Sequence, residues 1–181
     1  LMEIDVIEKA ESFETGGVRN TQKGLYQIRD PLINFWFRFI YPHLSEVYML
    51  GAEKFYDRYI APEIETYMNR YFVQVCGEYL ALMSRVHKLP IELTKQGTWI
   101  GKQGTIDIVA QDAVRNTIVG CCNWSKPAMT AADVRELLQT LKKARLSPKQ
   151  IYLFTATEFD AELIAWADRE EQLILIDMKQ L

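Results

Sequence analysis

The chain has few of the residues that build metal sites or disulfide frameworks. Its 181 residues include three cysteines and two histidines. Cys76, Cys121 and Cys122 form no CxxC pair, and His43 and His87 lie far apart in the sequence. Neither a zinc site nor a disulfide scaffold is therefore indicated. Unpaired thiols of this kind are typical of the reducing cytoplasm.

Long apolar runs and an excess of basic charge are also missing. No run approaches the roughly 18 apolar residues of a membrane span, and the N-terminus lacks the layout of a signal peptide. The 21 basic and 24 acidic residues give a net charge of -3, which argues against a broad nucleic-acid-binding surface but leaves a local basic patch open. We expect a cytoplasmic protein with no membrane partner.

The first third of the chain predicts a hairpin followed by an aromatic helix. Residues 1–29 read as a helix end and a β-hairpin, because apolar and polar residues partly alternate around Leu25 to Ile28. Asp30 and Pro31 then form a good helix start, and Pro42 bounds the far end. The segment between them is apolar all round, so we expect this helix to be buried, either between domains or under the core.

The rest of the chain predicts a mixed sheet flanked by helices. Apolar residues between 62 and 83 recur at the i, i+3, i+4 spacing of an amphipathic helix. Three short strands then follow with brief turns, which favours antiparallel pairing, and the later strands are separated by helices, which favours parallel crossovers. The expected order is αβββαβαβ, with strands at 99–101, 104–110, 116–124, 151–154 and 173–176 and helices at 131–144 and 161–169.

An αβββαβ core can carry a metal site built from the first helix and the second and third strands. In the PD-(D/E)xK nuclease superfamily, which this order resembles, the helix and second strand each give an acid and the third strand gives an acid-x-base pair. Here the helix supplies Glu78 and the second strand supplies Asp107. The third-strand pair falls on Cys121 and Asn123. The acids of such a site hold Mg²⁺, which activates water near the scissile phosphate.

The sequence also resembles a specific family over most of its length. Asp30-Pro31 leads into the aromatic block Phe35-Trp36-Phe37-Arg38-Phe39. Further matching segments lie at 76–78, 106–110, 120–124 and 152–154. Together they resemble the C-terminal domain of archaeal and bacterial AAA-type ATPases, a domain of unknown function numbered 234.

The resemblance implies a domain organisation in three parts. Residues 1–29 would end a winged-helix domain, with a wing around Gly16-Gly17, residues 30–61 would be a helical linker, and residues 62–181 would be the restriction-endonuclease-like domain. The chain begins without Met in a strongly patterned segment, so we expect a piece of a longer protein. The resemblance also implies that the nucleotide-binding domain lies upstream. Consistent with that, no GxxxxGK[ST] loop occurs in these residues, and ATP binding cannot be assigned to them.

The third strand departs from the family pattern at the two positions that cleavage needs. Family members usually resemble Gly-Glu-Cys-Lys-Trp there, whereas this chain has Cys121 at the Glu position and Asn123 at the Lys position. A thiol is a soft ligand poorly suited to Mg²⁺, and an amide carries no charge to stabilise the transition state. Glu78 and Asp107 alone would hold a metal weakly. We expect a catalytically degenerate domain with no confidently bound cofactor, with Mg²⁺ as the possible one.

Three functions remain open from the sequence. The first is a binding or regulatory module that contacts DNA or another macromolecule, or packs on the upstream ATPase domain in cis. The second is an active metal-dependent nuclease whose site is rearranged, with Asp112 or Lys102 joining the two acids, or Lys126 replacing the missing base. The third is a structural or oligomerisation domain. Glu78 could equally be an ordinary surface acid, and Asp107 could face solvent instead of a shared pocket.

Overall fold

The chain folds into two compact units. The computed structural model describes residues 6–10, 12–13, 25–102 and 104–181. One unit comprises residues 1–11 and 20–71, here called the helical unit, and the other comprises residues 12–19 and 72–181, here called the sheet unit. The long helix α4 (Ala61–Arg85) belongs to the helical unit up to Tyr71 and to the sheet unit from Phe72. The division into three parts at 29 and 61 stays a prediction.

The helical unit begins with a two-stranded antiparallel ladder. β1 (Ile7–Ala10) pairs with β2 (Leu25–Ile28), so that Ile7 lies opposite Ile28. The ladder fits the hairpin that the sequence predicts. The Gly16-Gly17 turn of that hairpin lies outside the described residues, and the winged-helix assignment stays a prediction.

Short helical segments follow the ladder and lead into α4. Asp30 caps the first of them, because its side chain accepts a hydrogen bond from Ile33 N at 2.9 Å, as expected from the Asp-Pro start. The segments are α1 (Pro31–Phe35), the π-helical turn η1 (Trp36–Ile40), the 3-10 turn η2 (Tyr41–His43), α2 (Leu44–Leu50), α3 (Ala52–Phe55) and the π-helical turn η3 (Tyr56–Ile60).

The aromatic helix is only partly buried, so the expectation of a buried helix is met in part. Phe39 packs with Phe55 and Tyr67 in the core of the helical unit. Trp36 and Phe37, in contrast, are 46% and 50% exposed. Short helices that pack along one stripe leave their other side chains facing outward, however apolar these are.

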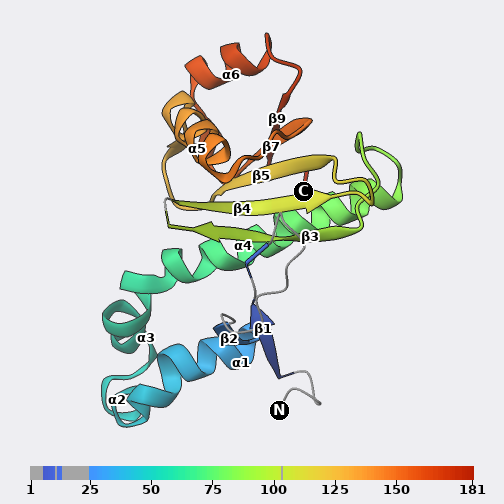
Figure 1. The fold of residues 1–181 in the computed structure, drawn as a ribbon. Coiled ribbons are helices and arrows are strands. Elements are labelled where there is room, and N and C mark those ends of the chain that lie inside the picture. The colour runs from blue at the N-terminus through green and yellow to red at the C-terminus, as the bar shows by residue number, and fades with distance from the viewer. Residues whose placement is uncertain (1–5, 11, 14–24, 103) are drawn as a thin grey trace. The chain divides into compact units, whose positions relative to one another are not determined.

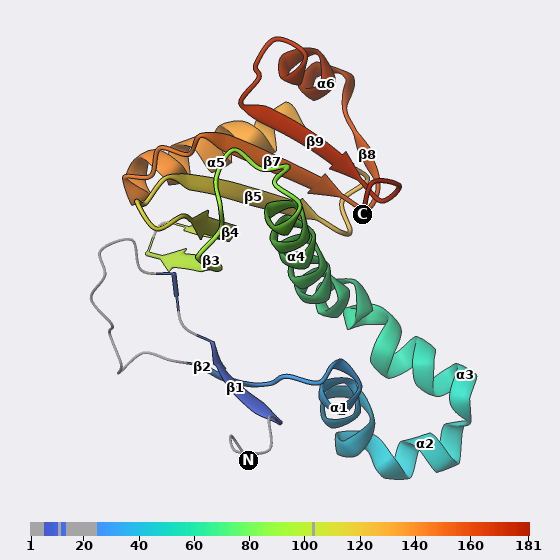
Figure 2. The ribbon, with the colours of Figure 1, turned by 90° about the vertical axis from the view of Figure 1, so that its right-hand side faces the viewer.

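The sheet unit contains one five-stranded mixed sheet, as the sequence predicts. Its order is β3-β4-β5-β7-β9, with β3, β4 and β5 antiparallel and β5, β7 and β9 parallel, and Figure 2 shows β7 between β5 and β9. The strands are β3 (Lys95–Gly101), β4 (Gly104–Gln111), β5 (Thr117–Asn123), β7 (Gln150–Thr155) and β9 (Leu173–Asp177). A small parallel pair that the sequence does not predict joins β6 (Ala128–Met129) to β8 (Glu158–Phe159).

Helices cover both faces of this sheet. α5 (Ala131–Ala144) and α6 (Ala161–Ala167) pack on one face, and the sheet-unit part of α4 packs on the other (Figure 1). Val134 and Leu153 belong to the first of these two cores, and Leu80 and Phe154 belong to the second. The result is a three-layer α/β architecture with the αβββαβ order expected from the sequence. Within the described ranges, no helix has the length and apolar character needed to cross a bilayer.

Candidate functional site

A β-bulge in β4 sets the direction of the Asp107 side chain. The pairing of β3 with β4 shifts between Gly97 and Trp99, so that β4 has one residue more than its partner there. Ile106 consequently belongs to the core on the α5 face, whereas Asp107 and Ile108 line one pocket on the α4 face. Bulges often re-aim a side chain beside a functional site. Simple alternation would have placed Asp107 and Ile108 on opposite faces.

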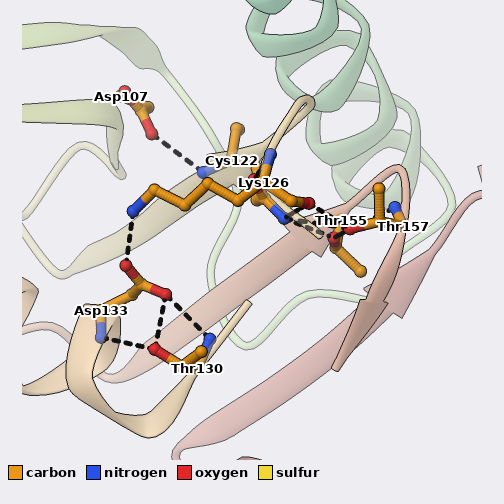
Figure 3. Close-up of polar contacts among 8 residues, drawn as sticks. Asp107, Cys122, Lys126, Thr130, Asp133, Thr155 and Thr157 are labelled. Carbon is orange, nitrogen blue, oxygen red and sulfur yellow. Dashed lines mark hydrogen bonds and ion pairs between the residues drawn. The ribbon is translucent and has the colours of Figure 1, made fainter. Parts of the chain in front are cut away.

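The Asp107 carboxylate stands where the ladder between β4 and β5 ends. The last pair of that ladder in this direction joins Ile108 to Gly120, while β5 continues alongside β7. Cys122 N donates a hydrogen bond of 2.9 Å to Asp107 Oδ2, so the carboxylate accepts from an amide beyond the paired region (Figure 3). Burial raises the pKa of Asp107, and the Cys122 amide opposes this rise by a smaller amount.

Glu78 shares this pocket with Asp107. α4 presents Gln74 and Glu78 one turn apart, and Gln74 Nε2 donates to Glu78 Oε1 at 3.0 Å. Both residues line the pocket, whose volume is about 350 Å³, together with Asp107. The structure therefore brings the two predicted acids to one place. Among the described side chains that line it, none is Lys, Arg or His.

The pocket also contains polar groups that the sequence pattern does not single out. Gln96 and Thr98 of β3 line it, and Thr98 Oγ1 donates to Asp107 O at 2.8 Å. Gln96 lies against α4 at Gly77, where an added Cβ would come within 2.4 Å of its Nε2. A glycine on the helix thus lets the amide of Gln96 approach closely. The i, i+4 spacing of Gln74 and Glu78 was the available sequence signal for the helix side of the pocket.

Cys121, at the expected Glu position, does not line the pocket. Its side chain packs with the core on the α5 face. Burial, reinforced by the negative charges of Asp107 and Asp133, raises the pKa of the Cys121 thiol to about 12. The thiol is therefore neutral at physiological pH. A neutral thiol neither replaces a carboxylate as a metal ligand nor activates water.

Asn123, at the expected Lys position, is held by a buried polar network. Its Nδ2 lies within hydrogen-bonding distance of Thr155 Oγ1 at 3.0 Å, Thr157 Oγ1 at 3.1 Å and Lys126 O at 3.2 Å. Its Oδ1 accepts from Lys126 N at 3.0 Å. These bonds join the ends of β5 and β7 to the loop after β5 (Figure 3). Asn123 therefore has a structural task, and it is not among the residues that line the pocket of Glu78.

The three groups considered as replacements have other roles. The ammonium of Lys126 pairs with Asp133 Oδ1 at 2.6 Å, which raises the pKa of Lys126, and Asp133 also completes the N-terminal cap of α5 (Figure 3). Lys102 is exposed in the turn between β3 and β4. Asp112 closes the turn between β4 and β5 by accepting from the backbone of Asn116 at 2.8 Å. None of the three lines the pocket of Glu78 and Asp107.

The donor set at this place does not fit a cleaving metal site. In the part of the chain that the structure describes, no three His, Cys, Asp or Glu side chains are grouped so that they could hold a metal ion. Two carboxylates remain, of which Asp107 has a raised pKa. Mg²⁺ held by so few protein ligands depends on waters and substrate oxygens. We therefore assign no step to a bound metal.

The fold and the site of the sheet unit together define a class of α/β domain. The sheet unit is an α/β domain with an αβββαβ core and an acidic pocket at a bulge of its second strand. The model of the family DUF234, described as archaeal and bacterial proteins of unknown function, matches residues 36–137. The chain belongs to this family.

Two further similarities accompany the family match. A curated relative, the uncharacterized protein MJECL04 of Methanocaldococcus jannaschii, is 32% identical over 149 residues, which are 81% of this chain and 32% of that protein. The chain thus spans about a third of the relative's length. The crystal structure of a protein of unknown function, AF1548, aligns with a TM-score of 0.42 and 20% identity over 62% of this chain and 60% of that one.

The raised pKa of Asp107 predicts a stabilising substitution. Because the pKa of Asp107 is higher in the folded than in the unfolded state, the folded state binds more protons between these two pKa values. The free energy of unfolding therefore decreases as the pH rises through that range. Asp107→Asn, which carries no charge, should increase the free energy of unfolding at pH 7 by an amount on the order of 1 kcal/mol. Urea unfolding at several pH values measures this.

The advantage of Asp107→Asn should shrink as the pH falls toward about 4, where an unfolded Asp also takes up a proton. Glu170→Gln is the matched control, because Glu170 is exposed on the surface of the sheet unit. An advantage that grows in acid would show that burial of the charge is not the cause.

Proposed function

We propose that the sheet unit is a nuclease-like domain that no longer cleaves nucleic acid and serves a larger protein as a partner-binding or regulatory module. One observation carries this proposal. Glu78 and Asp107 line a common pocket, whereas the third strand presents a neutral thiol at Cys121 and a hydrogen-bonded amide at Asn123. The pocket therefore contains two acids without the other groups that cleavage requires.

The physical argument concerns charge. Hydrolysis of a phosphodiester needs a well-held metal ion or another cationic group to offset the charge that develops on phosphate. The ammonium of Lys126, in the loop that follows the third strand, is paired with Asp133. A preformed pocket with polar and apolar walls is nevertheless suited to binding. Binding without cleavage is the function that these groups support best.

The context of a larger ATPase is part of the proposal. The chain spans 32% of the relative's length, and the aromatic segment around Phe35 to Phe39 is one of the segments that resemble the C-terminal domain of AAA-type ATPases. We place the sheet unit at the C-terminal side of such a protein, in the cytoplasm. There it would bind a macromolecule on behalf of the ATPase domain, or regulate that domain in cis.

Fluorescence anisotropy of labelled duplex and single-stranded DNA tests whether the pocket acts as a nuclease site. We expect any binding to be sensitive to salt, equal in chelator and in Mg²⁺, and unchanged in Asp107→Ala, because the pocket offers phosphate no cation. Glu170→Gln controls for the loss of one surface charge. Tight DNA binding that requires Mg²⁺ and disappears in Asp107→Ala would refute the proposal.

A further inference from the structure

The charge of the pocket points to a cationic ligand. Glu78 and Asp107 bring two carboxylates to its wall, and within the described residues neither forms an ion pair. Phosphate would meet these carboxylates without a compensating cation. A positively charged group would instead gain Coulomb energy and charge-assisted hydrogen bonds.

The neutral polar groups of the pocket favour a ligand with several N–H donors. The side-chain amides of Gln74 and Gln96 and the hydroxyl of Thr98 line the pocket beside the acids. Their oxygens, like the carboxylates, accept hydrogen bonds. A guanidinium group has five N–H donors fixed in one plane and can bind carboxylates in a bidentate manner. An ammonium has three N–H donors on a single nitrogen atom, so it reaches fewer of these separated acceptors at once.

The remaining walls suit the stem of a long side chain. Val73, Ala81 and Ile108 contribute apolar surface, and the volume of about 350 Å³ lies in the range of small-ligand pockets. Arginine buries its methylene groups along apolar surface while its charged end makes polar contacts. Gly77 has no side chain, which leaves room for the Gln96 amide against α4.

We propose that this pocket binds the side chain of an arginine presented by a partner protein. The inference rests on the proposed function, since it names the kind of partner that the non-cleaving module would take. Asp107 and Glu78 hold the guanidinium, Gln74 and Gln96 orient it, and the apolar wall packs against its stem. The sheet unit would recognise a protein through this site, and no phosphate contact is needed there.

The test is an NMR titration of the isotope-labelled chain with N-acetyl-arginine amide. N-acetyl-citrulline amide is the matched probe, because it has nearly the same shape without the charge. We expect saturable shifts of the backbone amides of Cys122 and Gly97 and at least tenfold tighter binding of the arginine probe. Asp107→Asn should weaken arginine binding at least tenfold, while Glu170→Gln should leave it unchanged. The unshifted remainder of the spectrum shows that each variant is folded.

Two results would overturn the inference. Equal binding of citrulline and arginine would exclude recognition of the charge, and arginine binding that survives in Asp107→Asn would place the ligand elsewhere. A metal-free duplex DNA that shifts the Cys122 and Gly97 amides would make nucleic acid the ligand, which also overturns the inference but leaves a non-cleaving module. Metal-dependent strand breakage would instead overturn the proposed function itself.

Discussion

Phe154→Ala is expected to reduce the free energy of unfolding by about 3–5 kcal/mol, the usual cost of deleting a buried phenyl ring. Phe154 is fully buried near the C-terminal end of β7, and its ring centroid lies 5.9 Å from that of Tyr79 on α4 in an edge-to-face contact. An alanine there leaves a cavity between helix and sheet. Because α4 also carries Glu78, the substitution should loosen the pocket together with the core. Urea unfolding followed by circular dichroism measures the loss.

Phe37→Ala is the control for this prediction. Phe37 is 50% exposed, so removing its ring should change the free energy of unfolding by no more than about 0.5 kcal/mol. Hydrogen exchange of the β7 amides locates the effect of Phe154→Ala, because the two units need not unfold together. Comparable costs for the two substitutions would show that burial in this core does not determine stability as we describe.

Asn123→Lys should also be strongly destabilising, although it introduces the residue type that the family resemblance leads us to expect there. The amide of Asn123 bonds Thr155, Thr157 and the backbone of Lys126, and a lysine cannot reproduce both its donors and its acceptor. We expect a loss of at least about 2 kcal/mol, from the unsatisfied partners and the buried ammonium. Thermal and urea unfolding both report this loss.

Asn69→Lys provides the same chemical change at another position. Asn69 lies on α4 in the helical unit, where lysine is a good helix former, and its cost should stay below about 1 kcal/mol. If Asn123→Lys were as stable as the wild type, the network around Asn123 would not be structural. The structure would then tolerate lysine at position 123, and the presence of asparagine there would need another explanation.

The sequence predicted most elements of the sheet unit closely, but β3 begins at Lys95, four residues before the expected strand at 99–101. The helix expected over 131–144 is α5, and the strands expected at 151–154 and 173–176 are β7 and β9 with one or two additional residues. These elements have strong periodicity and clear ends. The capping box of Thr130 and Asp133, for example, fixes the start of α5. Local chemistry was therefore sufficient for the order αβββαβ and for the mixed sheet.

The side chains around the site were harder to predict, for reasons that lie in tertiary structure. The bulge at Asp107 depends on how β3 pairs with β4, and no feature of the segment around Ile106 to Ile108 announces it. The task of Asn123 depends on threonines more than 30 residues later in the chain. The exposure of Trp36 depends on which side of its helix finds a partner. Periodicity contains none of this information.

The replacements at Cys121 and Asn123 distinguish the proposed module from an active nuclease. The rearranged-site alternative needs a base or cation near Asp107, yet Lys126 pairs with Asp133 and Asp112 closes a turn. A purely structural domain, the third alternative, would have no need of a pocket that holds two acids without a cation. The pocket is therefore the feature that favours binding over both alternatives.

Strand breakage under permissive conditions tests the central claim most directly. Labelled duplex and single-stranded DNA would be incubated with an excess of the chain in Mn²⁺, with Asp107→Ala alongside, and resolved on denaturing gels. Because neither Cys121 nor Asn123 supplies the missing chemistry, we predict no breakage by the wild type beyond that seen with Asp107→Ala. Metal-dependent breakage by the wild type that Asp107→Ala abolishes would contradict the account.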